Sequence, residues 1–324
     1  MGITPPSPAD EWAPCSDRSR ERCDPLSGSG GFGARWLLVE IDGSWGEHAF
    51  LDSYLGRELG WAIVRRAERA GLRPVAIRRL GRRADERRAE TQVRWAIADS
   101  RPGHESMHWG AVDDPAELTE LPLDGSAGVA SEEPAILVCT HARHDRCCAV
   151  RGRPVAAELT AAHPEATWEC SHLGGDRFAA TMILLPHGLY YGRVPAAVAP
   201  SIMEEYRQAR VVPEYFRGRS SLSNATQAAQ AFARDTFGDL GIQAWAPLRE
   251  EHHAEEASWS IDLAHGDDTV RVEMQQTWSE PLLSTCEAVR PAPVRQFALE
   301  SVTHGPSEAR DRQVDDTDQE EAHH

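Results

Sequence analysis

The sequence predicts an α/β fold, and two observations support this. Short apolar runs of strand length alternate along the chain with longer segments whose apolar residues recur at helical spacing. Polar segments rich in cysteine and histidine directly follow two of the predicted strands, which is where binding sites gather in open α/β sheets. A chain of 324 residues, of which 41% are hydrophobic, is long enough for two domains of about 150 residues each.

Composition and charge exclude several classes of protein. The chain has 34 basic and 51 acidic residues and a net charge of −17, so nucleic acid is not expected as a main partner. No apolar run approaches the roughly 20 residues needed to cross a bilayer, so no membrane partner is expected. Residues 1–23 lack the basic and apolar regions of a secretory signal, which predicts a cytoplasmic protein. Seven cysteines, an odd number, then favour metal or redox chemistry over disulfides.

The N-terminal part of the chain divides into a lead-in and an α/β portion. Residues 1–33 are rich in Pro, Ser, Asp and Gly, and we predict a disordered lead-in there. An N-terminal α/β portion is predicted over 34–125, because strand, helix and strand follow one another and Gly71 provides a helix stop. The predicted elements are a strand at 35–41, a helix at 49–70, and strands at 72–78 and 92–98.

A second unit is predicted over 126–250. Its first strand runs directly into Cys139, and Pro154 suits the first turn of the next helix because it has no N–H to satisfy. Asn224 suits the N-cap of the last helix. The predicted elements are a strand at 135–138, a helix at 154–162, a strand at 167–171, a hairpin of 178–185 and 189–194, and helices at 197–210 and 224–237.

The last part of the chain is predicted to be a hairpin followed by a tail. Strands at 258–264 and 269–275 flank a His-Gly-Asp-Asp turn, which predicts a small C-terminal β-hairpin extension over 251–305. Residues 306–324 carry seven acidic residues and almost no apolar one, so we predict a disordered acidic tail there. The hairpin is therefore expected to close the ordered part of the chain.

Two polar segments carry the candidate site. CTHARHDRCCAVRGRP contains Cys139 and Cys148, separated by eight residues, and WECSHLGGDRF contains His172 and Asp176, separated by three. Iron and zinc in proteins favour thiolate and imidazole ligands, so two loops with two donors each could close on one metal centre. Cys15, Cys23 and Cys286 have no partner at metal-ligand spacing, and no metal role is predicted for them.

Three stretches of the chain resemble the sucrase/ferredoxin-like family, a branch of the thioredoxin-like 2Fe–2S ferredoxins. They are CTHARHDRCCAVRGRPVAAEL, WECSHLGGDRFAATMILLPHGLYYGRV and, more weakly, ARWLLVEIDGSWGEHA. The resemblance implies a thioredoxin-like fold, with a mixed sheet flanked by helices, and a 2Fe–2S cluster that has Cys139 and Cys148 on one iron. Some relatives supply His-x3-His from the second loop and others Cys-x3-Cys.

The second loop departs from both of these family patterns, because it supplies His172 and Asp176. A carboxylate is a hard ligand and is uncommon on iron–sulfur clusters. Asp176 is the first choice for the fourth ligand because of its spacing. Cys147, Cys170 and His144 are the alternates.

The resemblance predicts an electron-transfer protein rather than a substrate-specific enzyme. Its partner would be a reductase or an electron acceptor. The Arg-rich segment (65–94) contains eleven arginines and four acidic residues, and such a surface could steer docking of an acidic redox partner.

The sequence leaves a zinc-binding or thiol-redox function open and gives no support for sugar hydrolysis. Zinc could replace iron at the Cys/His site, or a thiol could act on disulfides, although the chain lacks the C-x-x-C spacing of a resolving thiol. Sugar hydrolysis needs two carboxylates across a cleft, and no pair stands in a recognisable setting.

Overall fold

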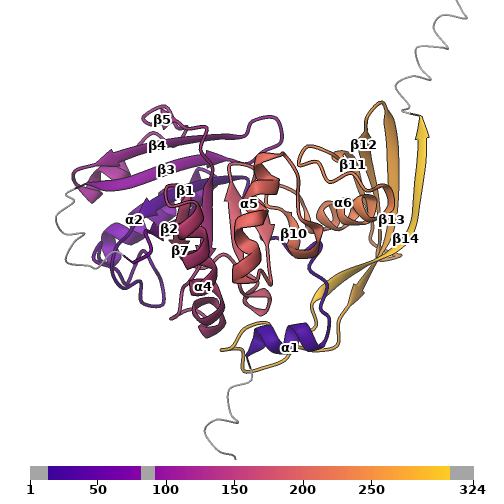
Figure 1. Cartoon of the computed structure of the whole chain (residues 1–324), viewed down its shortest axis with the longest axis horizontal. Helices are drawn as coiled ribbons and strands as arrows, with labels where there is room; N and C mark the ends of the chain where they lie inside the picture. Colours follow the sequence, from indigo (N-terminus) through magenta and orange to yellow (C-terminus); the bar gives the residue numbers. More distant parts are fainter. Residues whose placement is uncertain (1–13, 82–91, 307–324) are drawn as a thin grey trace, which may run out of the picture.

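The computed structural model describes residues 14–81 and 92–306, and it contains two sheets (Figure 1). The larger sheet has ten strands in the order β10-β9-β8-β6-β7-β2-β1-β3-β4-β5, and the smaller one has four in the order β11-β12-β13-β14. The strands of the larger sheet are β1 (Arg35–Glu40), β2 (Leu72–Arg78), β3 (Val93–Asp99), β4 (Ser106–Val112), β5 (Val129–Ala130), β6 (Ala135–Cys139), β7 (Thr167–Cys170), β8 (Met182–Leu185), β9 (Leu189–Tyr191) and β10 (Phe216–Arg219). Those of the smaller sheet are β11 (Ala246–His253), β12 (Ser258–His265), β13 (Asp268–Trp278) and β14 (Arg295–Pro306).

Helices pack against both sheets. Figure 1 shows α4 and α5 in front of the larger sheet and α6 against the smaller one. The described α-helices are α1 (Cys15–Glu21), α2 (Arg57–Arg69), α4 (Arg146–Ala162), α5 (Ala199–Arg207) and α6 (Asn224–Phe237). The 3-10 helices are η1 (Pro115–Thr119), η2 (Asp176–Phe178), η3 (Ala196–Val198) and η4 (Pro213–Tyr215). The predicted α/β class, with a mixed sheet flanked by helices, is confirmed.

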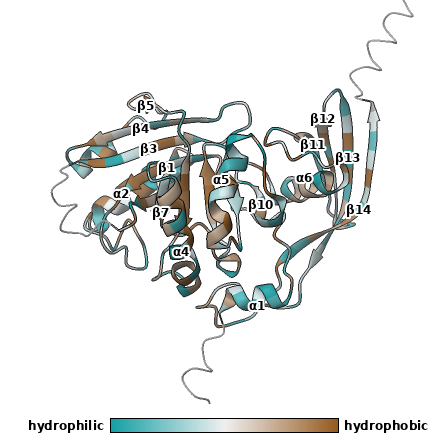
Figure 2. Ribbon diagram, in the orientation of Figure 1, coloured by the Kyte–Doolittle hydropathy of each residue, from teal (hydrophilic) through white to brown (hydrophobic). Residues whose placement is uncertain are grey.

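The central part of the larger sheet has a thioredoxin-like arrangement. Strands β6 and β7 are parallel and are joined through α4. Strand β8 pairs antiparallel with β6, and β9 pairs antiparallel with β8. All residues of β6, β7, β8 and β9 are buried, so this part of the sheet is covered on both faces. Figure 2 shows the hydrophobic residues concentrated in these central strands, whereas α1 is largely hydrophilic.

One sheet runs through the N-terminal portion and the thioredoxin-like part. Strand β1 pairs parallel with β2 and antiparallel with β3, and β2 continues the sheet by pairing antiparallel with β7. The β2–β7 contact is short, with Ile77 opposite Cys170 and Arg78 opposite Glu169. The side chains of Arg78 and Glu169 also form an ion pair at 2.9 Å. Residues 34–125 therefore extend the same sheet.

Helix α4 begins eight residues before the predicted start at Pro154. Asp145 is its N-cap, and its carboxylate accepts a hydrogen bond of 2.7 Å from the backbone N–H of Cys147. Pro154 lies inside the helix instead of in its first turn, so that part of the prediction is wrong. The sequence did not predict this helix start, because the residues around the cap are polar and no apolar periodicity begins there.

The predicted C-terminal hairpin is present, and it forms the middle of a four-stranded sheet. Strands β12 and β13 match the predicted pair, and β11 and β14 flank them. Nearly all of β11 is exposed, so it lacks the apolar alternation that predicts a half-buried strand. Alanines of α6 pack on the inner face against Ile261, Val270 and Val272.

The chain from residue 14 to residue 33 belongs to the folded protein, which corrects the predicted disordered lead-in over 1–33. Helix α1 lies in this segment, and the backbone N–H of Gly33 bonds to the carbonyl of Ser220 at 2.8 Å. The Arg193 guanidinium donates to the carbonyls of Ser19 and Asp24 at 2.9 and 2.8 Å. These partners lie far along the chain, so local composition gave no sign of them. Residues 1–13 and the predicted acidic tail from 307 onward lie outside the described residues.

Within the ranges that the structure describes, no helix is both long enough and apolar enough to cross a bilayer.

Close packing of α4 on β6 leads to a first prediction. A Cβ at Gly152 would lie 2.1 Å from the backbone carbonyl oxygen of Cys139. Helix propensity alone would make Gly152→Ala stabilising by about 1 kcal/mol. We expect the opposite sign, a lower free energy of unfolding by about 1–3 kcal/mol, because the backbone must move apart. Denaturant unfolding measures this difference.

The exposed Ala157 on the same helix supplies the control. Ala157→Val should change stability only by the difference in helix propensity, about 0.5 kcal/mol. A Gly152→Ala protein more stable than the wild type would show that α4 does not pack this closely on β6.

Candidate metal centre

Parallel pairing of β6 and β7 creates the site. Cys139 ends β6 directly opposite Cys170, which ends β7, so the two following loops leave the sheet side by side. The first loop leads into α4, where Cys148 is the third residue. The second loop carries His172 and turns through Gly174 and Gly175, both with positive φ, before η2 begins at Asp176. The sheet therefore brings two segments about 30 residues apart to one edge.

The four predicted ligands form one connected group of side chains. The Cys148 thiol donates to Asp176 Oδ1 at 3.1 Å, and His172 Nδ1 lies 3.2 Å from the same oxygen. The Cys139 sulfur interacts with the Cys148 thiol and with the His172 ring. The structure thus brings Cys139, Cys148, His172 and Asp176 together; their binding of a metal stays a prediction.

The group is almost completely shielded from water. Cys139, Cys148 and Asp176 are at most 2% exposed, whereas the His172 side chain is 29% exposed. His172 is therefore the member of the group that reaches the surface. Its Nδ1 atom is buried and has no aligned hydrogen bond within the described residues, despite its proximity to Asp176. Because it lies next to the Asp176 carboxylate, this nitrogen must lose its proton before it can bind a metal.

Burial and mutual hydrogen bonding shift the pKa values of the group. The thiol hydrogen bond from Cys148 lowers the pKa of Cys139 well below the usual range, and the same bond raises that of Cys148. Burial works against charging His172, but the neighbouring Asp176 carboxylate and Cys139 sulfur outweigh it and raise its pKa to about 9. Burial likewise opposes ionisation of Asp176, yet His172 lowers its pKa overall. The group is therefore suited to carrying negative charge on sulfur and oxygen next to a cation.

The three alternate ligands lie in different places. The His144 ring contacts the His172 ring in a tilted arrangement with centroids 3.7 Å apart, and ring nitrogens of both lie within 4.8 Å of each other and of an Asp176 oxygen. Cys170 is buried in the core cluster with Trp168 and other apolar side chains. Cys147, although next to Cys148 in the chain, points toward Cys15 and Cys286. Among the alternates, His144 is the one positioned beside the predicted ligands.

Two arginines that sequence reasoning missed as site residues hold the second loop. Arg73 donates to the carbonyl of Leu173 at 2.8 Å, and Arg217 donates to that of Gly174 at 3.0 Å. A Cβ at Gly175 would lie 2.2 Å from an Arg217 nitrogen, which explains the need for glycine there. Arg217 lies about 40 residues after the loop, and no spacing rule in the sequence connects the two. The guanidinium groups also place positive charge beside the site.

Most described arginines of the Arg-rich segment serve internal contacts. Arg66 donates to the carbonyl of Leu121, Arg78 to that of Gly43, and Arg79 to that of Thr167. Arg65 and Arg69 of the same segment are exposed. Residues 82–91, with several more arginines, lie outside the described residues. Docking of a partner on this segment therefore stays a prediction.

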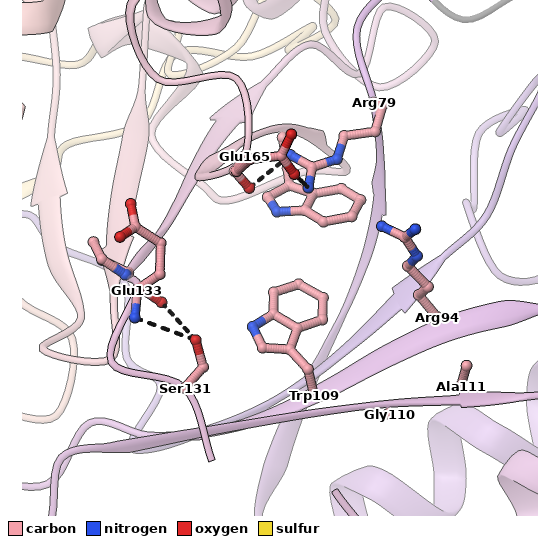
Figure 3. A pocket seen from close by; sticks show the side chains of 10 residues that line it. Arg79, Arg94, Trp109, Gly110, Ala111, Ser131, Glu133 and Glu165 are labelled. Atoms are coloured by element: carbon pink, nitrogen blue, oxygen red, sulfur yellow. Dashed lines mark hydrogen bonds and ion pairs between the residues drawn. The ribbon is translucent and has the colours of Figure 1, made fainter. Parts of the chain in front are cut away.

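A hollow of about 480 Å³ opens elsewhere on the same sheet (Figure 3). Arg79 lies over the Trp168 ring at 3.6 Å, and the Trp109 ring stacks on Trp168 with centroids 5.3 Å apart. Pro134 and Glu165, which precede β6 and β7, also line it. The hollow is therefore at the start of these strands, and the candidate metal centre is at their other end.

The chain matches the model of one protein family. The match is to the sucrase/ferredoxin-like family and covers residues 34–218, more than half of the chain. The chain belongs to the sucrase/ferredoxin-like family. The matched range runs from just before β1 into β10 and contains all four predicted ligands, as well as Arg73 and Arg217. The resemblance inferred from the sequence motifs is thereby confirmed.

Two solved structures are similar to part of the chain. One is a thioredoxin-like 2Fe–2S ferredoxin from Aquifex aeolicus, with 15% identity over 28% of this chain and 94% of the ferredoxin, at a TM-score of 0.25. The other is a variant of that protein with one cysteine replaced by serine, with 15% identity over 26% of this chain and 96% of the variant, at a TM-score of 0.23. No curated protein matches the chain.

The contact between Arg217 and Gly175 leads to a second prediction. Gly174 and Gly175 both have positive φ, so alanine is strained at either position. Only at Gly175 would the new Cβ also collide with a buried guanidinium, since nothing lies within 4 Å of one at Gly174. We expect Gly175→Ala to lower the free energy of unfolding by about 1–3 kcal/mol more than Gly174→Ala does. Equal effects in denaturant unfolding would contradict the role given to Arg217.

Proposed function

We propose that this protein binds a 2Fe–2S cluster and transfers single electrons between redox partners. Cys139, Cys148, His172 and Asp176 would hold the cluster, with the two thiolates on one iron and the second loop on the other. When bound, such a cluster supplies a reversible one-electron couple. The observation that carries the proposal is the placement of two thiols and an imidazole in mutual contact at one sheet edge, in a member of this family.

The chemistry of the donor set suits an iron–sulfur centre. Thiolate and imidazole are established ligands of 2Fe–2S irons, and the lowered pKa of Cys139 favours its thiolate. Asp176 remains the proposed fourth ligand because it contacts both Cys148 and His172. His144 is the proposed substitute, because its ring already contacts that of His172.

The surrounding residues have separate tasks in this proposal. The buried strand ends exclude water from the thiols, and Arg73 and Arg217 fix the carbonyls of the second loop. His172 reaches the surface and therefore offers a path for an electron between the buried group and a partner protein. We further propose that a reductase or electron acceptor docks with the help of exposed arginines in the Arg-rich segment, such as Arg65 and Arg69.

One observation favours zinc as the second candidate. Asp176 Oδ1 lies 3.1 Å from the Cys148 sulfur and 3.2 Å from His172 Nδ1, and donor atoms of His144, His172 and Asp176 all lie within 4.8 Å of one another. Zinc binds tetrahedrally to Cys, His and carboxylate ligands and carries no redox chemistry. Metal analysis separates the two functions.

The test is an absorption spectrum of full-length protein purified without oxygen, together with iron and acid-labile sulfide assays. We expect a red-brown protein with about two irons and two sulfides per chain. His172→Ala should change the spectrum and lower the iron content, because it removes a ligand. Cys23→Ser replaces an exposed cysteine and serves as the control, with no expected change. A colourless protein without iron after cluster reconstitution would falsify the proposal.

Replacement of the imidazole by a thiolate should lower the reduction potential. Histidine ligands raise the potential of 2Fe–2S centres by a few hundred millivolts relative to all-cysteine ligation. We therefore expect His172→Cys to shift the midpoint potential downward by on the order of 100 mV or more, measured by a redox titration. His104→Cys, at an exposed loop position, is the control. An unchanged potential in a fully loaded His172→Cys protein would mean that His172 is not a ligand.

A further inference from the structure

Three cysteines from distant parts of the chain meet at the start of α4. Cys15 begins α1, Cys147 lies in the first turn of α4, and Cys286 lies in the connection between β13 and β14. The sulfur of Cys147 lies 3.6 Å from that of Cys15 and 3.2 Å from that of Cys286, and the remaining pair is 3.6 Å apart. The prediction that Cys15 and Cys286 lack a partner is therefore wrong.

A carboxylate completes this group. Asp145 Oδ1 accepts from the backbone N–H of Cys147, and Oδ2 accepts from that of Cys286, both at 2.7 Å. Oδ2 also lies 3.9 Å from the Cys15 sulfur. One donor atom from each of Cys15, Cys147, Cys286 and Asp145 lies within 4.8 Å of the other three. The fold thus places three sulfurs and one oxygen around a common point.

The spacing and surroundings differ from those of ordinary core cysteines. Zinc bonded to sulfur at about 2.3 Å in a tetrahedron separates the sulfurs by about 3.8 Å, close to the observed distances. Apolar packing around the group is slight, because Ala179 is the remaining buried member of its core cluster. The Asp145 carboxylate accepts from the backbone N–H groups of Cys147 and Cys286 and so fixes the positions of these two cysteines relative to each other.

We propose that Cys15, Cys147 and Cys286 bind one zinc ion, with Asp145 Oδ2 as the fourth ligand. The three thiols lose their protons to solvent when zinc binds, and zinc itself is neither oxidised nor reduced. This site is separate from the group that contains Cys148. Cys148 contacts Asp176, and its neighbour Cys147 contacts Cys15 and Cys286, so the two adjacent cysteines serve different sites.

The zinc site would fasten α1 and the β13–β14 connection to the start of α4. Figure 1 shows α1 beside the segment that connects β13 and β14. Cys15 and Cys286 are 271 residues apart, and both meet Cys147 next to the candidate metal centre. A metal that closes such long loops restricts the unfolded chain strongly, so its role is structural. The segments that it holds include α1, whose own side chains are largely polar.

The experiment is zinc analysis of full-length protein, purified without chelators, by inductively coupled plasma mass spectrometry. We expect about one zinc per chain in the wild type. Cys15→Ser and Cys286→Ser should each lower the zinc content at least about tenfold, while iron and sulfide contents stay unchanged. Cys23→Ser, which replaces an exposed cysteine outside the group, should keep its zinc. Far-UV circular dichroism confirms that the serine variants are folded.

The outcomes separate this site from the proposed iron–sulfur site. Zinc that is lost in His172→Ala but retained in Cys286→Ser would place the ion at the other site and overturn the inference. Wild-type protein that stays free of zinc after equimolar Zn²⁺ and dialysis would also overturn it. So would a Cys147–Cys286 disulfide found by peptide mapping of protein purified under reducing conditions. Iron content has no bearing on these three results.

Discussion

The pairing of β6 with β7 is the contact on which the candidate metal centre depends. Parallel strands end at the same edge of a sheet, so Cys139 and Cys170 come to lie opposite each other and both following loops start from one place. Strand β8 holds β6 from its other side, and β2 holds β7. The site residues are therefore carried by strands in the middle of a ten-stranded sheet, where backbone movement is most restricted.

The beginning of α4 has a second, equally local constraint. Asp145 caps the helix, and Cys147 and Cys148 follow in its first turn. Successive residues of an α-helix point about 100° apart, so two adjacent thiols point in different directions and contact different groups of side chains. Cys148 faces the second loop and Asp176, and Cys147 faces α1 and the β13–β14 connection. One helix start thereby supplies donors to two clusters of side chains.

Contacts within short stretches of chain could be predicted from the sequence, and long-range ones could not. Strand β2 and helix α6 have the bounds that the spacing of apolar residues predicts, because each buries its apolar residues against the core. The sequence did not predict strands β11 and β14, since edge strands need no apolar alternation. It did not predict α1 either, because the partners of this helix include Arg193, Cys147 and Cys286, which lie far along the chain. Arg217 likewise became a site residue only through folding.

The sequence by itself determined the α/β class and the family, and it predicted the four side chains of the candidate metal centre, because the motif spacing and two strand ends lie within about 40 residues of one another. Tertiary structure alone decided which neighbouring thiol faces which cluster, which arginines support the second loop, and that Cys15 and Cys286 meet Cys147. The physical reason is distance along the chain. Contacts between residues 43 to 271 positions apart depend on how whole sheets and helices pack, and no local pattern of residue types encodes them.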